Sequence, residues 1–269
     1  MVRLARYRRR LGQNFLADPN LLDAIVRESR VGAEDVVLEV GPGEGALSTR
    51  LAERVSHLHA IEIDRRLEPE LASLSAATNV SLHWGDAMKL DLASLEPRPG
   101  TVVSNLPYSV ATPLILRTIE QLPGVRSWTV MVQRQIADRL AASPGSRLYG
   151  APTVLVRLAA EVEILRRVDR AVFVPRPRVD SALLALRRTG PAAPAHLRAL
   201  VRDAFAHRRK SLPRSLELCR PGRLDAAREA LRELGLAEDA RAETLSPEDF
   251  TNLTAKLGQA ARSEEPEAT

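Results

Sequence analysis

Residues 36–45 read VVLEVGPGEG, an almost wholly apolar run that leads straight into a turn with three glycines. The apolar run is typical of a strand buried on both faces of a parallel sheet. Gly41, Gly43 and Gly45 allow a tight turn and let a ligand approach the main chain. Helical spacing follows to about Arg54. We therefore expect a strand–turn–helix unit whose free helix N–H groups face a bound ligand.

The alternation of strand and helix extends to both sides of this unit. Residues 20–29 have helical apolar spacing after a possible Asp18-Pro19 start. Further helices are predicted up to residue 77 and over residues 110–122 and 134–142, and further strands over residues 57–64, 80–86, 101–108, 127–133 and 179–188. Such alternation favours an α/β fold with a mostly parallel, Rossmann-like sheet and helices on both faces.

The composition changes after the last predicted strand. Residues 189–195, TGPAAPA, are typical of a linker, and residues 196–209, 224–236 and 246–258 beyond it have helical periodicity. One of these helices is predicted to begin with Ser246 as N-cap and Pro247 at its first position. We expect an α/β domain over residues 1–188, a small helical domain over residues 196–258 and a disordered acidic tail over residues 259–269.

Length and composition exclude several classes of protein. With 269 residues, 45% of them hydrophobic, the chain can form a real core and is not wholly disordered. A single cysteine, Cys219, excludes an internal disulfide and favours a reducing compartment. Neither a signal-like apolar run nor an apolar stretch of about 20 residues occurs. We expect a cytoplasmic protein with no membrane partner.

The net charge of +5 is unevenly distributed. Residues 1–10 carry five arginines and no acid; residues 198–223 carry eight basic and two acidic residues. Basic blocks suit the phosphate backbone of a nucleic acid, although a solvated arginine face is the simpler alternative. The candidate RNA-binding residues are Arg8, Arg9 and Arg10 in an N-terminal arm, and Arg208, Arg209, Lys210 and Arg214 in the helical domain.

Glu62 follows Gly41 by 21 residues, at the end of the second predicted strand. A carboxylate there can accept both hydroxyl groups of a ribose, so the glycine turn and Glu62 together predict an adenosine-containing cofactor. The neighbouring Ile63 belongs to the same predicted site. Asp86 and Ala87 end the third strand, where a carboxylate can bind the adenine amino group.

The identity of the cofactor depends on the charges beside the turn. Gly41, Gly43 and Ala46 also satisfy the G-x-G-x-x-A pattern of NAD-binding proteins. Glu39 and Glu44 would repel a pyrophosphate, however, and would attract the ammonium and sulfonium groups of S-adenosylmethionine. We expect S-adenosylmethionine, with NAD as the alternative.

The sequence Asn105-Leu106-Pro107-Tyr108 ends the fourth predicted strand, at the sheet edge where α/β proteins bind ligands. The Asn105 amide oxygen and the Leu106 carbonyl could accept the two hydrogens of a nucleobase amine, and Tyr108 could stack on an extruded base. Alone, the tetrapeptide would indicate only a helix-start turn with a buried tyrosine. In register with the glycine turn, Glu62 and Asp86, it predicts methylation of a base amine. The five histidines lack metal-ligand spacing, and this chemistry needs no metal.

Eight motifs occur in the order found in the ribosomal RNA adenine dimethyltransferases, and the chain most resembles their bacterial small-subunit group (RsmA/KsgA). The motifs are LGQNFL (11–16), EVGPGEGALS (39–48), AIEID (60–64), GDAM (85–88), SNLPYSVATPL (104–114), MVQRQIADRLAASPGSRLYG (131–150), VPRPRVDSALL (174–184) and FAHRRKSL (205–212). The resemblance implies a class I methyltransferase fold and cofactor contacts from Asn14, Leu16 and Asn105.

The same resemblance implies dimethylation of two adjacent adenines near the 3′ end of 16S rRNA within an immature small ribosomal subunit. We expect the protein to act as a monomer. The chain departs from the family pattern at Ala151–Arg157, in the residues before Asp180-Ser181, and at Arg214, where the family commonly has asparagine. Three alternatives stay open: an assembly factor without activity, methylation of large-subunit rRNA as in the macrolide-resistance relatives, and an NAD-dependent oxidoreductase. Asn-Leu-Pro-Tyr, rather than Asn-Ile-Pro, favours the small subunit.

Overall fold

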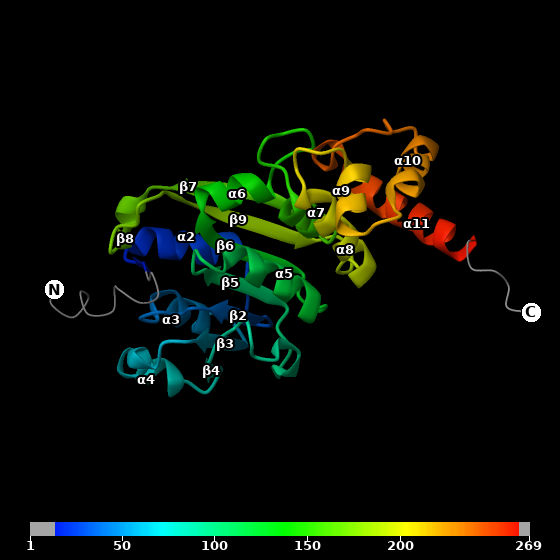
Figure 1. The fold of residues 1–269 in the computed structure, drawn as a ribbon. Coiled ribbons are helices and arrows are strands. Elements are labelled where there is room, and N and C mark those ends of the chain that lie inside the picture. The colour runs from blue at the N-terminus through cyan, green and yellow to red at the C-terminus, as the bar shows by residue number, and fades with distance from the viewer. Residues whose placement is uncertain (1–13, 264–269) are drawn as a thin grey trace, which may run out of the picture. The chain divides into compact units, whose positions relative to one another are not determined.

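The structure is a computed structural model that describes residues 14–263 (Figure 1). Its strands are β1 (Phe15–Leu16), β2 (Val36–Val40), β3 (His57–Glu62), β4 (Val80–Trp84), β5 (Thr101–Asn105), β6 (Ser127–Gln133), β7 (Ala160–Val168), β8 (Phe173–Val174) and β9 (Ser181–Arg188). Its α-helices are α2 (Pro19–Ser29), α3 (Ala46–Ala52), α4 (Glu68–Ser75), α5 (Ala111–Gln121), α6 (Arg134–Leu140), α7 (Ala151–Arg157), α8 (Ala195–Ala206), α9 (Leu212–Cys219), α10 (Leu224–Glu233) and α11 (Pro247–Ser263).

Seven strands form the central sheet in the order β4-β3-β2-β5-β6-β9-β7. The five strands from β4 to β6 in this order are parallel to one another, which confirms the predicted mostly parallel sheet. Strands β9 and β7 are antiparallel to their neighbours, so one edge departs from the parallel pattern. The chain order reverses between β2 and β5, and such a switch point is where open α/β sheets bind ligands.

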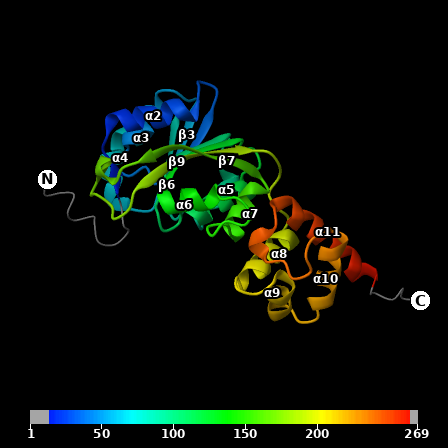
Figure 2. The same ribbon diagram turned by 90° about the horizontal axis from the view of Figure 1, so that it is seen from above.

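Helices cover both faces of this sheet, as predicted. Figure 2 shows α2, α3 and α4 on one face and α5 and α6 on the other. On the first face, Ile25 of α2 and Leu51 of α3 pack in one buried cluster with strand residues such as Val37 and Met131. The start of α2 was also predicted correctly, since Asp18 caps the helix by accepting a hydrogen bond from the Leu21 N–H at 3.1 Å.

Five elements were missed by the sequence analysis. Residues 153–168 were assigned to no element, yet they form most of α7 and all of β7. Helix α9 begins Leu212-Pro213, and its proline lies in the first turn, where the missing N–H costs nothing. The two-stranded sheet of β1 and β8 has strands of two residues each, too short for any alternating pattern to show.

The described chain divides into two compact units that differ from the predicted domains. The first runs to Asp138 and resumes over Ala160–Thr189; the second comprises Arg139–Ala159 and the chain from Gly190 onward. Residues 139–159 were expected in the first domain. They instead pack with the helical unit, because the Arg208 side chain donates hydrogen bonds to the carbonyls of Arg147 and Tyr149, and the Tyr149 ring lies against Phe205.

The last helix tests two further predictions, the N-cap at Ser246 and the start of the acidic tail. Ser246 caps α11 as expected, accepting from the Asp249 N–H at 3.1 Å. This helix continues to Ser263, past residue 259 where the tail was predicted to begin, so residues 259–263 are helical. The rest of the predicted tail and the arginine arm lie outside the described residues. Within residues 14–263, none of the helices has the length and apolarity required to cross a bilayer.

Candidate active site

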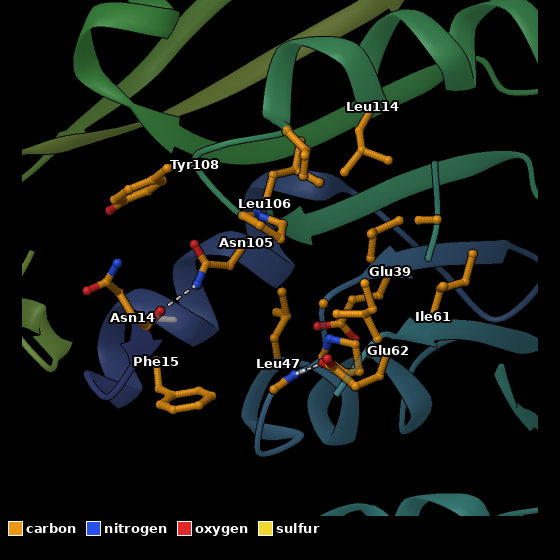
Figure 3. Close-up of a pocket in the computed structure, with 18 of the residues that line it drawn as sticks. Asn14, Phe15, Glu39, Leu47, Ile61, Glu62, Asn105, Leu106, Tyr108 and Leu114 are labelled. Carbon is orange, nitrogen blue, oxygen red and sulfur yellow. Dashed lines mark hydrogen bonds between the residues drawn. The ribbon is translucent and has the colours of Figure 1, made fainter. Parts of the chain in front are cut away.

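A cavity of about 290 Å³ opens in the first unit at the carboxyl ends of the parallel strands, beside the switch point between β2 and β5. All of the predicted cofactor and catalytic residues line it: Asn14, Leu16, Gly41, Gly43, Glu62, Ile63, Asp86, Ala87, Asn105, Leu106, Pro107 and Tyr108. Figure 3 shows Asn105 and Glu62 projecting into the same space from neighbouring parts of the sheet. The structure therefore brings these predicted residues together in one cavity, although residues 14 and 108 are far apart in the chain.

The glycine turn brings bare backbone to the wall of the cavity. Gly41, Gly43 and Gly45 have φ angles of +78°, +61° and +84°, a region that other L-residues rarely adopt. A Cβ atom on Gly43 would lie 2.9 Å from the Phe15 ring, so a larger residue would also displace that ring. Glycine at position 43 is required both for the conformation and for the space.

The Glu62 carboxylate is buried at the end of β3 and organises the turn. Its Oε2 accepts a hydrogen bond from the Gly43 N–H at 3.2 Å, and its Oε1 accepts from the Asp64 N–H at 2.8 Å. Burial raises the pKa of Glu62 above its ordinary value. Each carboxylate oxygen has a second lone pair, which suits it to accept from the two hydroxyls of a ribose.

Glu39, at the end of β2, is a second buried carboxyl group in the cavity wall, only 1% exposed. Its Oε2 has no hydrogen-bond partner among the described residues. Burial, with a smaller contribution from the Glu62 charge, raises the pKa of Glu39 to about 8. An unsatisfied acid of this kind would gain a partner from a cationic ligand group.

We expect Glu39 to make the free protein less stable as the pH rises. In the unfolded chain its pKa returns to 4.5, so between about pH 4.5 and 8 the folded state holds more protons than the unfolded state. Stability then falls through this range, by on the order of a few kcal/mol. Urea unfolding at several pH values should show a shallower decline for Glu39→Gln than for the wild type. Parallel pH profiles for the two proteins would contradict the assignment.

The adenine end of the predicted cofactor site has a polar and an apolar component. The Asp86 Oδ1 accepts from the Met88 N–H at 2.9 Å, which orients the carboxylate at the end of β4. Ile63 is 53% exposed, unusual for a large apolar side chain, and Ala87 is buried. Asp86 can thus accept from an adenine amino group while Ile63 offers apolar surface to the ring.

The N-terminal segment closes the cavity on the side opposite the sheet. Strand β1 pairs with β8, so that Phe15 is opposite Val174 and Leu16 is opposite Phe173. This pairing holds the Phe15 ring against Gly43, while Leu16 is buried in the core. Phe15 was not predicted as a site residue, because nothing in the sequence shows which side chain of LGQNFL covers the glycine turn.

The tetrapeptide Asn105–Tyr108 is held by contacts on both sides of the cavity. The Asn105 Nδ2 donates to the Asn14 carbonyl at 3.4 Å, and in Figure 3 its Oδ1 points away from Asn14. The Leu106 N–H donates to the Met131 carbonyl at 3.1 Å. The Tyr108 hydroxyl lies 2.6 Å from the Ser181 hydroxyl. Asn105 therefore presents an acceptor oxygen to the cavity, next to an aromatic ring.

These features fit S-adenosylmethionine. The glycine turn contributes Gly41 and Gly43 to the cavity wall, Glu62 has acceptor capacity for a ribose, and Glu39 carries a buried oxygen without a partner among the described residues. Within residues 14–263, His, Cys, Asp and Glu side chains nowhere form a group of three or more that could hold a metal ion.

The predicted RNA-binding residues of the second unit differ in their surroundings. Arg208 forms an ion pair with Glu243 at 3.2 Å and donates two hydrogen bonds to the 147–149 loop, so its guanidinium is committed to the fold. Arg209, Lys210 and Arg214 are exposed. Arg8, Arg9 and Arg10 lie outside the described residues.

Solved structures share the fold. A dimethyladenosine transferase from Plasmodium falciparum superimposes with a TM-score of 0.78, at 24% identity, over 92% of this chain and 98% of its own. The 23S rRNA methyltransferase ErmE superimposes with a TM-score of 0.67, at 28% identity, over 91% of this chain and 100% of its own. The predicted class I methyltransferase fold is confirmed.

Proteins of similar sequence match this chain over almost its whole length. A ribosomal RNA small subunit methyltransferase A of Rubrobacter xylanophilus is 44% identical over 259 residues, which cover 95% of this chain and 97% of the relative. The protein of the same name from Thermobifida fusca is 41% identical over 254 residues, covering 90% and 88%. Residues 4–259 match the family model described as ribosomal RNA adenine dimethylase. This chain therefore belongs to the ribosomal RNA adenine dimethylase family.

Proposed function

We propose that this protein transfers methyl groups from S-adenosylmethionine to the N6 amines of two adjacent adenines near the 3′ end of 16S rRNA, within an immature small subunit. The observation that carries the proposal is the position of Asn105 and Tyr108 in the same cavity as the glycine turn and Glu62. An amide acceptor and an aromatic ring next to a fitted cofactor site suit an extruded base.

The cofactor would be held by Glu62 at the ribose, by Asp86 and Ile63 at the adenine, and by Glu39 at the ammonium group. When bound, it supplies an activated methyl group on a sulfonium. The backbone of Gly41 and Gly43 shapes the wall beside it, and Phe15 closes the turn from outside.

The target amine is activated by its two acceptors. The lone pair of an adenine N6 is delocalised into the ring, so the amine is a poor nucleophile. Hydrogen bonds from its two hydrogens to the Asn105 Oδ1 and the Leu106 carbonyl favour a pyramidal nitrogen, whose lone pair is then less delocalised into the ring and more nucleophilic. After the first transfer one hydrogen remains, so the second transfer retains one of these contacts. The rate enhancement comes from positioning and electrostatics, with no covalent intermediate.

The small subunit is the preferred substrate because the relatives that are 38–44% identical carry small-subunit names. The fold is also that of ErmE, a 23S rRNA methyltransferase, which makes large-subunit rRNA the second candidate. We place the reaction in the cytoplasm, where bacterial ribosomes assemble, and expect the protein to act as a monomer.

The test is transfer of tritiated methyl groups from S-adenosylmethionine to small subunits that lack these modifications, followed by separation of the nucleosides. We expect dimethyladenosine in immature small subunits, and none in naked 16S rRNA, mature subunits or large subunits. Label in large subunits would favour the second candidate. No label, with cofactor binding intact, would favour an assembly factor without activity.

We further propose that the second unit docks on rRNA through Arg209, Lys210 and Arg214. Replacing all three with alanine should weaken rRNA binding and lower the slope of log K against log salt by about 2, since each lost phosphate contact removes about 0.7–0.9. Filter binding between low and physiological salt measures this slope. The matched control is Arg228→Ala with Arg232→Ala and Lys256→Ala, which removes the same charge from cations that are paired with acids in the same unit. Equal slopes for the two triple variants would exclude this docking face.

A further inference from the structure

The Ser181 hydroxyl is the hydrogen-bond partner of Tyr108. Ser181 is fully buried at the first position of β9, and its Oγ lies 2.6 Å from the Tyr108 hydroxyl, a separation at which either group can donate. The two residues are 73 positions apart in the chain. A tyrosine hydroxyl that leaves water needs such a partner, so removal of either hydroxyl breaks the same bond.

The backbone of Ser181 is held on both sides. Strand β9 lies between β6 and β7, where Ser181 is in register with Gln133 of β6 and with Val168 of β7. One residue earlier, the Asp180 carbonyl accepts from the Arg134 N–H at 2.9 Å. The Ser181 hydroxyl is therefore a fixed point of the sheet.

Tyr108 lies in a less constrained part of the chain. It follows the end of β5 in a turn, outside any strand. Strand β6 separates β5 from β9, and two strand spacings amount to roughly 10 Å. The tyrosine side chain consequently reaches across the end of β6, with its backbone on the β5 side and its hydroxyl on β9. The far end of the ring is fixed by this one hydrogen bond, while the ring itself lines the cavity beside Asn105 (Figure 3).

We infer that Ser181 is a positioning residue for methyl transfer: through its hydrogen bond it holds the Tyr108 ring in the plane on which the target adenine stacks. The inference rests on the proposed function. A ring free to swing would leave the base amine misplaced relative to Asn105 and Leu106, and small misplacements slow a reaction that depends on positioning. The cofactor contacts lie on other residues, so its affinity should not depend on Ser181.

The test compares Ser181→Ala, Tyr108→Phe and the double variant in single-turnover transfer to unmethylated small subunits at saturating S-adenosylmethionine. We expect each single variant to lose about tenfold in rate, and the double variant to lose no more, because all three lack the same bond. Cofactor affinity by calorimetry should stay at the wild-type value. Ser127→Ala is the matched control, since it removes a hydroxyl that pairs with Thr101 at 3.2 Å at the opposite end of β5 and β6.

A second measurement reports on the base itself. The fluorescence of 2-aminopurine placed at the target position of immature small subunits should be quenched by stacking in the wild-type complex, and quenched less in the complexes of Ser181→Ala and Tyr108→Phe. Tyr108→Phe breaks the bond without altering the buried site of Ser181, so it keeps the test informative if Ser181→Ala folds poorly.

Three results would overturn the inference: a wild-type rate for Tyr108→Phe, a double variant whose loss is the product of the single losses, or quenching that no variant changes. If the wild-type protein transfers no methyl group to any subunit, the proposed function fails and the inference with it. If the wild type is active and the variants match it, only the inference fails.

Discussion

Replacing Asn105 with alanine should lower the rate of methyl transfer about 10³-fold, while the dissociation constant of S-adenosylmethionine stays within a few-fold of wild type. The amide oxygen is the side-chain acceptor that we assign to the base amine, and alanine cannot replace it. The hydrogen bond lost from the fold is the 3.4 Å contact to Asn14, which is long, so stability should change little. Single-turnover transfer and calorimetry measure the two quantities separately.

The matched control is Asn79→Ala. The Asn79 amide donates to the carbonyls of Ala52 and Val55 at 2.8 and 3.1 Å, away from the cavity, so its loss should reduce stability by about 1–2 kcal/mol and leave turnover unchanged. Wild-type turnover in the Asn105 variant would exclude the proposed activation of the amine. A loss of cofactor binding that matched the loss of rate would instead give Asn105 a role in the cofactor site.

The second large effect is expected from Glu62→Ala, which should weaken S-adenosylmethionine binding about 100-fold. Two hydrogen bonds from ribose hydroxyls to a charged acceptor are lost, at about 1.5 kcal/mol or more each, and the Gly43 N–H loses its partner as well. The ionised carboxylate accepts best, and burial raises the pKa of Glu62. Cofactor affinity should therefore decline as the pH falls through that raised pKa, and the decline should be smaller in Glu62→Gln, where only the titration of Glu39 remains.

Calorimetry between pH 5 and pH 8 would measure these affinities. Glu53→Ala is a suitable control, because it removes one exposed carboxylate at the end of α3 without touching the cavity. An unchanged affinity in Glu62→Ala would mean that the ribose is bound elsewhere. An affinity profile in Glu62→Gln identical to that of the wild type would assign the whole titration to another group.

Much of the first unit could be predicted because its residues carry local signals. The apolar run of β2, the turn after Gly41 and the acid at Glu62 each indicate their structure from a few neighbouring residues, and the parallel topology then brings Asp86 and Asn105 to the same edge. The same charges at Glu39 and Glu44 favoured S-adenosylmethionine over NAD. The oxidoreductase alternative was wrong, since the chain belongs to a methyltransferase family.

Pairings over long sequence distances could not be predicted. The motif around Asp180-Ser181 was visible, yet nothing in it shows that Ser181 meets Tyr108. Arg208 resembled its basic neighbours in sequence, but its hydrogen bonds to Arg147 and Tyr149 exist only because α8 packs with the 139–159 segment. A single sequence gives the residue types. Which charged side chains form hydrogen bonds within the protein depends on tertiary packing.

The pairing of β1 with β8 makes the chain intolerant of insertions and deletions near residue 17. Asp18 fixes the start of α2, and only Ala17 separates it from Leu16. Side chains alternate between the two faces of a strand, so one added or removed residue would exchange the environments of Phe15 and Leu16. Phe15 would leave the glycine turn, and the Asn14 carbonyl would no longer meet Asn105. In protein engineering, an extra residue or fusion joint at this position would therefore break the contact of Phe15 with the glycine turn and that of Asn14 with Asn105, even with every catalytic residue intact.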